Sequence, residues 1–564
     1  MDSISVLKTF LATGFKGDID DSAAELTTMS HDASLLEVRP KIVLFPKDSA
    51  DIQTVVKFVH ENKSKYPDLS ITARSAGTDM SGGPLNDSII LDVSRYMQGI
   101  LNLAKTPSVT VVQGNEISGT ATILPGTFYR DFEPEAAKLG LLLPCYTASK
   151  NLNTLGGMVA NNSAGEKTLR YGKMENFIDS LKVVFADGRE YIVKALSKSE
   201  LDAKIAQNDF EASVYKKIWD IASTNSKALA FAKPKVSKNS AGYYLWNVWN
   251  PATETFDLTR LIVGSQGTLG IVTEATIRLV AIKPISKLFV VFMPSLDHLG
   301  EIVRDIVAFK PESFESYDDS TMALAVKFLP SMLHTMKLHN FTSLLWSFRP
   351  EAWMMLSGGF PKLVLLVEFC GDDEKAIEKT EIALQAKIAH YGFKMRRAKD
   401  GIDSEKYWTI RRESFNLLRQ HVKGRRTAPF VDDIIVPPDT MPDFLPKMRA
   451  ILDKYKLLYT IAGHAGDGNF HIIPLMDMKD PANAKAIAEV SDLVYDLVLS
   501  YGGSITAEHN DGIIRTPYLI KQYGPEIIAL FQQAKDAFDA QNIFNPGKKV
   551  GGTKEYMMAH LAKM

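Results

Sequence analysis

Cysteine is nearly absent from this sequence. The 564 residues include only two cysteines, Cys145 and Cys370, which stand far apart. Two isolated thiols provide no disulfide framework, no CxxC redox pair and no four-thiolate set for an iron–sulfur cluster. We therefore expect a reducing environment, and any iron–sulfur centre that exchanges electrons with this protein must belong to another chain.

The sequence also lacks a surplus of charge and a long apolar run. Its 65 basic residues balance 66 acidic ones, whereas nucleic-acid-binding domains usually carry a basic surplus, so we expect a small-molecule substrate and no nucleic acid. No run of about twenty uncharged apolar residues is present, which argues against a transmembrane helix. Residues 1–23 show no signal-peptide pattern, so a cytoplasmic location is expected.

The hydrophobic pattern predicts an α+β protein of several domains. Residues 37–95 alternate apolar runs with a helical pattern, in "KIVLFP", "SADIQTVVKFVHENKSKY", "LSITARS" and "SIILDVSRY", which predicts a β-α-β unit and a further strand. A strand-rich part follows, and then a mixture of strands and amphipathic helices. The predicted divisions are 1–36, 37–285, 286–500 and 501–564.

A glycine-rich loop, "RSAGTDMSGGPL", lies between the second and third predicted strands. Gly77, Gly82 and Gly83 free its backbone to present several N–H groups together, as phosphate-binding loops do. Taken alone, the loop is equally compatible with an ordinary surface turn.

Three further stretches follow this loop in order: "NTLGGMVANNSAGEKTLRYGKMENFIDSLKVVFADGRE", "LIVGSQGTLGIVTEATIRL" and "FDAQNIFNPGK". Together the motifs resemble the FAD-linked oxidases of the vanillyl-alcohol oxidase and p-cresol methylhydroxylase type, and more closely their D-lactate and D-2-hydroxyglutarate dehydrogenase branch. The resemblance implies a two-subdomain FAD-binding domain over 37–285 and an α+β substrate or cap domain over 286–500. It further implies a C-terminal helical segment, 501–564, that returns to the flavin.

The resemblance also implies which positions contact FAD. The first loop would bind the pyrophosphate through Arg74, Ser75, Gly77, Thr78 and Ser81. The segment that wraps the flavin would contribute Thr154, Gly156, Gly157, Asn161 and Gly165. The later motifs would contribute Gly264, Gly267, Thr268, Ile271 and Asn545. Gln266 stands where the family often has glutamate, and Thr78 and Asp79 stand where covalent members often carry histidine, so FAD is expected to bind non-covalently.

Two histidines flank a predicted hairpin turn in "TIAGHAGDGNFHIIP". Strand alternation places Thr460, Ala462 and His464 on one face, and pairing brings His471 beside them. An isolated pair of this kind more often satisfies ordinary hydrogen bonds than binds a metal.

A third stretch, "GGSITAEHNDGIIRTPYL", adds Glu508 and His509. The combination resembles the "GHxGDGNxH" and "EH" segments of the family's metal-dependent members. It implies that His464, His471 and Glu508 hold a divalent cation (Zn, Mn or Fe) and that His509 is the base. Asn510 departs from the family's common "EHGxG", which puts the pocket shape at that point in doubt.

Substrate binding is expected to involve an arginine. Arg411 lies in a predicted helix and matches a carboxylate-binding arginine of the family, although neighbouring Arg412 and Glu413 leave a solvated helix face as the alternative. A family lysine has no match, because Val431 falls near its place. The candidate substitutes are Lys423, Arg425 and Arg426.

These features predict an FAD- and metal-dependent dehydrogenase that oxidises a D-2-hydroxy acid, D-lactate favoured, to the 2-oxo acid. The electron acceptor would be a quinone, a cytochrome, an electron-transfer flavoprotein or an iron–sulfur partner. The alternatives are a D-2-hydroxyglutarate dehydrogenase and a flavin-binding electron-relay subunit with a degenerate metal site. The related ether-lipid synthase is disfavoured because its histidine-rich run is not found.

One apolar segment, 328–360, leaves two readings open. Stretches of this composition are usually core or cap helices. The alternative is a surface that docks on a partner redox protein or peripherally on the inner face of a membrane. A homodimer is also left open.

Overall fold

The computed structural model describes residues 2–327, 361–399, 401–421 and 424–562. The apolar segment 328–360 and Lys423, both singled out in the sequence, lie outside the described residues. Within the described residues the chain forms three sheets with helices packed around them, so the α+β prediction is confirmed. None of the described helices is both long and apolar enough to cross a membrane.

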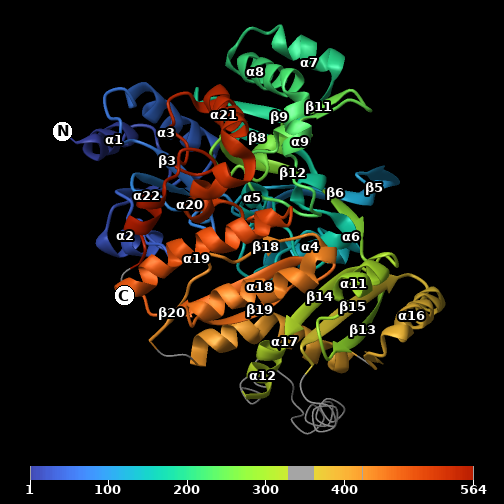
Figure 1. The fold of residues 1–564 in the computed structure, drawn as a ribbon. Helices are drawn as coiled ribbons and strands as arrows, with labels where there is room; N and C mark the ends of the chain where they lie inside the picture. The colour runs from blue at the N-terminus through green and yellow to red at the C-terminus, as the bar shows by residue number, and fades with distance from the viewer. Residues whose placement is uncertain (1, 328–360, 400, 422–423, 563–564) are drawn as a thin grey trace.

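The first sheet orders its strands β1-β2-β4-β3 (Figure 1). The strands are β1 (Asp18–Asp20), β2 (Ile42–Phe45), β3 (Ile71–Arg74) and β4 (Ile89–Asp92). β2, β4 and β3 are parallel, and most of their positions carry apolar side chains, as in other buried parallel strands. Helix α3 (Ser49–Asn62) is capped by Asp48 and joins β2 to β3. The glycine-rich loop therefore leaves the carboxyl end of β3, the edge at which open parallel sheets bind ligands.

Two short helices, α1 (Ser3–Leu11) and α2 (Ala23–Met29), precede and flank this sheet. Leu7 and Leu11 of α1 are buried in the same apolar cluster as the inner side chains of α3.

The second sheet is antiparallel in the order β10-β11-β9-β8-β12-β6-β5, with β7 paired to β12. Its strands are β5 (Ile100–Val112), β6 (Asn115–Ile123), β7 (Leu141–Leu142), β8 (Ile178–Val184), β9 (Glu190–Ser197), β10 (Trp249–Asn250), β11 (Thr255–Asp257) and β12 (Ile271–Ala281). The helices of this region are α4 (Tyr129–Lys138), α5 (Leu155–Asn161), α6 (Thr168–Tyr171), α7 (Lys198–Ile205), α8 (Phe210–Thr224), α9 (Ser226–Ala232) and α10 (Thr259–Ile262).

The third sheet is ordered β16-β13-β15-β14-β19-β20-β17, with β18 paired to β20. Its strands are β13 (Ile285–Met293), β14 (Ser313–Asp318), β15 (Leu363–Gly371), β16 (Lys394–Arg397), β17 (Arg426–Thr427), β18 (Ile434–Ile435), β19 (Leu458–His464) and β20 (Asn469–Met476). The accompanying helices are α11 (Leu299–Val307), α12 (Asp319–Lys327), α16 (Glu374–Ile388), α17 (Gly401–His421), α18 (Met441–Lys454) and α19 (Pro481–Ser500).

The two faces of the third sheet carry different helices. Along β13 and β15 alternate side chains enter two separate apolar clusters, as the period of two requires. One face packs with α11, α16 and α18, whereas the other packs with α12 and α17. Glu315 of β14 points to the second face, because its neighbour Phe314 enters the first cluster.

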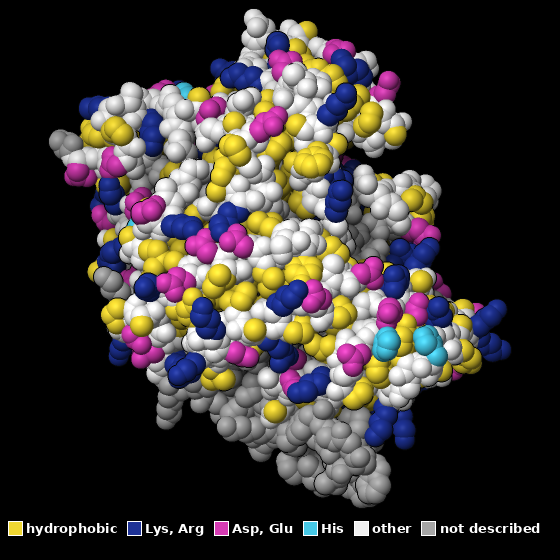
Figure 2. Space-filling model, viewed as in Figure 1, with side chains coloured by type: hydrophobic (Ala, Val, Ile, Leu, Met, Phe, Trp, Pro, Cys, Tyr) yellow, Lys and Arg dark blue, Asp and Glu magenta, His cyan; other side chains and the backbone are white. Residues whose placement is uncertain are grey.

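The C-terminal segment returns to the N-terminal sheet (Figure 1). It contains α20 (Gly512–Arg515), α21 (Leu519–Asp539) and α22 (Lys554–Ala559). The Asn545 backbone N–H donates to Ile71 of β3, and Leu561 bridges to Leu36. Figure 2 shows acidic and basic side chains interspersed over the visible face, in keeping with the near-neutral charge balance.

Candidate active site

One large cavity, of about 970 Å³, is lined by residues from all three sheets. The glycine-rich loop after β3 and the start of α5 line part of it, and the β19–β20 hairpin and the 508–509 loop line another part. This volume lies at the upper end of the range for small-molecule sites, so the cavity can hold a large ligand.

The three predicted metal ligands converge in this cavity. In the β19–β20 hairpin His471 pairs with Ala462, which lies two residues before His464 on the same strand. The imidazole centroids of His464 and His471 lie 5.3 Å apart. Oε1 of Glu508 lies 3.0 Å from Nε2 of His464 and 3.1 Å from Nε2 of His471. The turn requires Gly468, whose φ is +74° and whose added Cβ would lie 2.1 Å from the Val436 carbonyl oxygen.

The Glu508 carboxylate is placed to share a divalent cation with either histidine, although His464 is not part of the set of ligand-type atoms that lie within 4.8 Å of one another. Atoms that share one tetrahedral ion at 2.0–2.1 Å are separated by about 3.3 Å, close to the two distances from Glu508. Burial lowers the pKa of His471, but Asp432 and Glu508 outweigh it and raise this pKa to about 10. Burial raises the pKa of Glu508, but His464 and Lys238 outweigh it and hold the value well below its usual range.

Carboxylates behind these ligands were not anticipated from the sequence. Oε1 of Glu315 lies 2.6 Å from Nδ1 of His464. Oδ1 of Asp432 lies 3.3 Å from Nδ1 of His471, and Oδ2 lies 2.7 Å from Nδ1 of His509, although at an angle that is poor for a hydrogen bond. Carboxylates in this position fix imidazole orientation and raise ligand basicity.

A buried lysine also escaped the sequence reading. Nζ of Lys238 lies 3.0 Å from Asp467 and 3.5 Å from Oε2 of Glu508, so it balances carboxylate charge beside the ligands. The available signals were acidic residues inside apolar runs, "FESYD" and "FVDDIIVP", and the lysine in "VSKNSAG". None of them indicates a particular partner.

Asp433 holds the loop that carries Glu508 and His509. Its Oδ2 accepts hydrogen bonds from the backbone N–H groups of Ala507, Glu508 and His509 and from the Thr506 hydroxyl, at 2.7–2.9 Å. Ligand-type atoms of Asp433 and His509 also lie within 4.8 Å of those of His471 and Glu508. Because its carboxylate is saturated with donors, Asp433 is better suited to fixing the loop than to binding a cation.

Comparison with known families agrees with this layout. Residues 40–194 match the family model of an FAD binding domain, and residues 284–549 match that of the C-terminal domain of FAD linked oxidases. The chain belongs to the FAD-linked oxidases. The second match begins one residue before β13, at the point where the chain passes from the second sheet to the third.

Several relatives of this FAD-linked oxidase are known. It is 28% identical to a D-2-hydroxyglutarate dehydrogenase of Escherichia coli over 97% of this chain and 51% of the relative, so it spans about half the length of that protein. It is 24% identical to a mitochondrial cytochrome-type D-lactate dehydrogenase of Arabidopsis thaliana over 97% of this chain and 80% of the relative. The fold matches a p-cresol methylhydroxylase structure, with a TM-score of 0.68 at 15% identity and 97% coverage of both chains.

Most positions that the motifs match to FAD line the cavity of this oxidase. The lining set is Arg74, Ser75, Gly77, Thr78, Thr154, Gly156, Gly157, Asn161, Gly165 and Gly267. The Asn161 Oδ1 atom is buried without a hydrogen-bond partner among the described residues, as expected for an atom that serves a ligand. A Cβ on Gly156 would lie 2.5 Å from the Pro125 carbonyl oxygen, so only glycine lets the wall approach this closely. These residues therefore fit FAD.

Arg74 lines the cavity but its guanidinium is bound to backbone carbonyl oxygens, and five other matched positions lie outside the cavity lining. The Arg74 guanidinium donates to the carbonyl oxygens of Met29 and His31, which fastens the N-terminal segment beside the loop. Asn545 lies behind the wall, where its amide donates to the carbonyl oxygens of Gly83 and Gln266. The other four positions outside the cavity lining are Ser81, Gly264, Thr268 and Ile271.

Gln266 and Asn510, where the sequence departs from the family pattern, connect the cofactor segments to the 508–512 loop. The Gln266 Oε1 atom accepts from the Gly512 N–H at 2.9 Å, and its amide nitrogen lies 3.2 Å from Asp79, where a glutamate would add a second carboxylate. Asn510 adopts a positive φ of 68° and donates to the carbonyl oxygens of Asn161 and Gly264. Asparagine therefore takes the conformation that glycine usually provides and adds two contacts.

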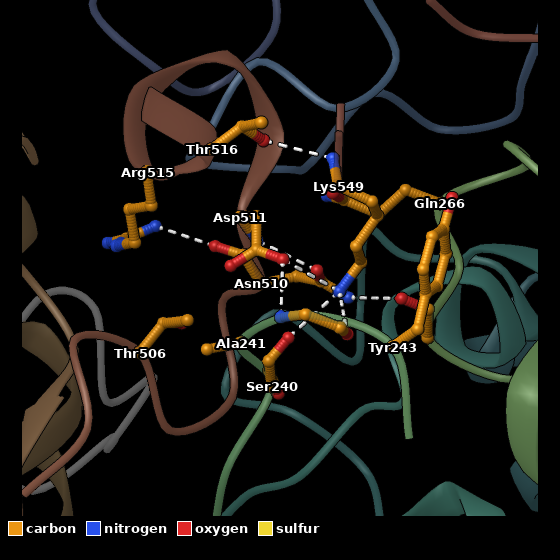
Figure 3. Close-up of polar contacts among 12 residues, drawn as sticks. Ser240, Ala241, Tyr243, Gln266, Thr506, Asn510, Asp511, Arg515, Thr516 and Lys549 are labelled. Carbon is orange, nitrogen blue, oxygen red and sulfur yellow. Dashed lines mark hydrogen bonds and ion pairs between the residues drawn. The ribbon is translucent and has the colours of Figure 1, made fainter. Parts of the chain in front are cut away.

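A buried ion pair supports the next residue of this loop (Figure 3). Nζ of Lys549 lies 2.9 Å from Oδ2 of Asp511, which also accepts from the Gly242 N–H. Arg515 donates to the carbonyl oxygens of Asn510 and Asp432. The loop with Glu508 and His509 is thus fixed from both the cofactor side and the cap side.

Besides Arg74, four arginines of the oxidase line the cavity, in two pairs. Arg411 is ion-paired with Glu315 at 3.0 Å, and Arg412 forms a bidentate contact with Glu166 at 2.8–2.9 Å. Arg425 and Arg426 line the same cavity, and their side chains make no hydrogen bond or ion pair with another described residue.

Proposed function

We propose that this chain is an FAD- and divalent-metal-dependent dehydrogenase that oxidises a D-2-hydroxy acid to the 2-oxo acid. The observation that carries the proposal is the convergence of His464, His471 and Glu508, with His509 beside them, in the cavity that the FAD-matched segments line. The domain limits and site roles expected from the sequence are part of the same proposal.

The residues divide the chemistry among them. Bound FAD supplies the acceptor for the hydrogen on the substrate's α carbon, with its electron pair. His464, His471 and Glu508 would hold a divalent cation, which would supply a Lewis acid that lowers the pKa of the substrate hydroxyl. His509 accepts the hydroxyl proton at Nε2, because Nδ1 faces Asp432.

The arginines support a substrate with a second acidic group. The charges of Arg411 and Arg412 are balanced by Glu315 and Glu166, whereas Arg425 and Arg426 have no acidic partner among the described residues. An unpaired guanidinium in a cavity suits a carboxylate. D-2-hydroxyglutarate, the substrate named for the relative in Escherichia coli, therefore becomes the favoured acid over D-lactate, the acid favoured from the sequence.

Electrons would leave through an acceptor other than a nicotinamide. We retain a quinone, a cytochrome, an electron-transfer flavoprotein or an iron–sulfur partner as the candidates. An iron–sulfur centre would belong to the partner, because the two cysteines of this chain cannot ligate a cluster.

Anaerobic bleaching of the bound flavin tests the proposal. The protein is mixed without oxygen with D- and L-2-hydroxyglutarate and with D- and L-lactate, and flavin absorbance is followed. We expect bleaching by the D acids only, and at the lowest concentration by D-2-hydroxyglutarate. Flavin that stays yellow with every acid but is reduced by a redox partner would instead identify an electron-relay subunit.

A further inference from the structure

Glu315 holds two groups of the site with one carboxylate. It lies on β14, is 1% exposed and lines the cavity. Oε1 lies 2.6 Å from Nδ1 of His464, and Oε2 lies 3.0 Å from both Nε and Nη2 of Arg411. The two carboxylate oxygens thus contact two different side chains of the site.

Strand register brings this contact about. In the β14–β19 ladder Ser316 pairs with Gly463 and Tyr317 with Ala462. One further step along the same register places Glu315 directly opposite His464. Side chains in directly opposite positions of neighbouring strands are close enough to touch. Arg411 reaches the same carboxylate from α17, which packs over this face of the sheet.

The contact determines which atoms of both partners remain available. Because Nδ1 of His464 faces Glu315, Nε2 faces Glu508, where a cation would bind. Because Arg411 uses Nε and Nη2, its remaining nitrogen, Nη1, has no partner among the described residues. An arginine fixed along one edge can present the other edge to a carboxylate.

We propose that Glu315 is a positioning residue that couples substrate-carboxylate recognition by Arg411 to the orientation of the metal ligand His464. The inference rests on the proposed function and adds a residue to it. A buried ion pair without this role would affect only the stability of the fold.

The test compares Glu315→Gln with Glu312→Gln, a matched buried carboxylate that pairs with Lys167 and Lys283 and does not line the cavity. Metal affinity is measured on the FAD-loaded protein by chelator competition, without substrate. Glu315→Gln should weaken it by about 10- to 100-fold, the usual effect of a lost outer-shell partner, and should also raise KM. Glu312→Gln should leave both quantities unchanged.

A double variant separates the two arms of the coupling. With the metal kept at a saturating concentration, Arg411→Met should raise KM, and adding Glu315→Gln to it should raise KM no further, because under this condition the carboxylate acts on substrate only through Arg411. The loss of metal affinity caused by Glu315→Gln should persist in the double variant.

Unchanged metal affinity and KM in Glu315→Gln, with only a lower melting temperature, would overturn the inference. If that variant does not fold, Glu315→Asp keeps the charge but is one methylene too short for both contacts; wild-type values of both quantities there would also overturn it. Wild-type protein that binds metal but oxidises no 2-hydroxy acid would refute the proposed function, while the metal-affinity comparison would still report on Glu315.

Discussion

Replacing Asp433 by asparagine should loosen the loop that carries Glu508 and His509 without changing its shape. Oδ2 of Asp433 accepts four hydrogen bonds at 2.7–2.9 Å, three of them from consecutive backbone N–H groups. Asp433 has a positive φ of 65°, a conformation that asparagine tolerates well, so the substitution removes the charge with little backbone strain.

The expected magnitude follows from the number of bonds. A hydrogen bond to a charged group contributes roughly 1.5–3 kcal/mol, against about 0.5–1.5 kcal/mol for a neutral one. Over four bonds the lost charge assistance is worth about 4 kcal/mol, or about a thousandfold in the equilibrium constant for local opening. Rearrangement of Asn469, which donates to the other oxygen at 3.1 Å, would reduce this effect.

Hydrogen exchange of the amides at 507–509 measures the opening directly, and anaerobic flavin reduction measures its consequence. We expect exchange to accelerate by about 100- to 1000-fold and reduction to slow. Asp51→Asn is the matched control, because Asp51 is buried and accepts from the backbone N–H groups of Lys16 and Lys47 outside the cavity. Exchange at 507–509 within threefold of wild type would refute the assignment of Asp433 as the anchor of this loop.

Three further predictions concern the cofactor and the proposed ligands. Acid precipitation should release the flavin, because Thr78 and Asp79 occupy the place of the histidine that covalent members often carry; colour retained in the pellet would contradict this. Single alanine variants of His464, His471 and Glu508 should lose metal but keep FAD. The His509→Ala variant should instead keep metal and slow flavin reduction about a hundredfold. Metal analysis and stopped-flow absorbance measure these effects, and metal loss in His509→Ala or metal retention in the other three variants would contradict the assignment. Burial and the neighbouring Asp79 raise the pKa of Asp32, which lines the cavity, to about 7. The fold favours the neutral form of Asp32, so the contribution of Asp32 to stability is full below the pKa of the unfolded chain, near 4, and is lost as pH rises through about 7. FAD affinity should fall over the same rise in pH, because a carboxylate then faces the pyrophosphate loop. An Asp32→Asn variant with the same pH profile as wild type would disprove this.

The sequence predicted the local elements well because their signals are local. The β-α-β unit of 37–95 follows from uninterrupted apolar runs around a capped helix, and the hairpin follows from two strands around "AGDG". The convergence of Glu508 with the hairpin histidines came from family resemblance, since no periodicity places a loop 37 residues further along the chain beside His471.

The supporting residues could not be predicted because their partners are distant in sequence. Glu315 meets His464 only through the strand order β14-β19. Asp432 and Asp433 are adjacent and chemically identical, yet one faces imidazoles and the other faces backbone N–H groups. Arg411 was expected as a free carboxylate binder, whereas its pairing with Glu315 becomes visible only when α17 is packed on the sheet.

Removal and return of the metal test the central claim most directly. Protein stripped of divalent cations and kept fully loaded with FAD is mixed anaerobically with D-2-hydroxyglutarate, and flavin absorbance is recorded before and after a stoichiometric divalent cation is added. The account predicts negligible bleaching before addition and rapid bleaching after it, with no such recovery in a His471→Ala variant. Equally fast bleaching in the stripped and reloaded protein would contradict a metal role for His464, His471 and Glu508.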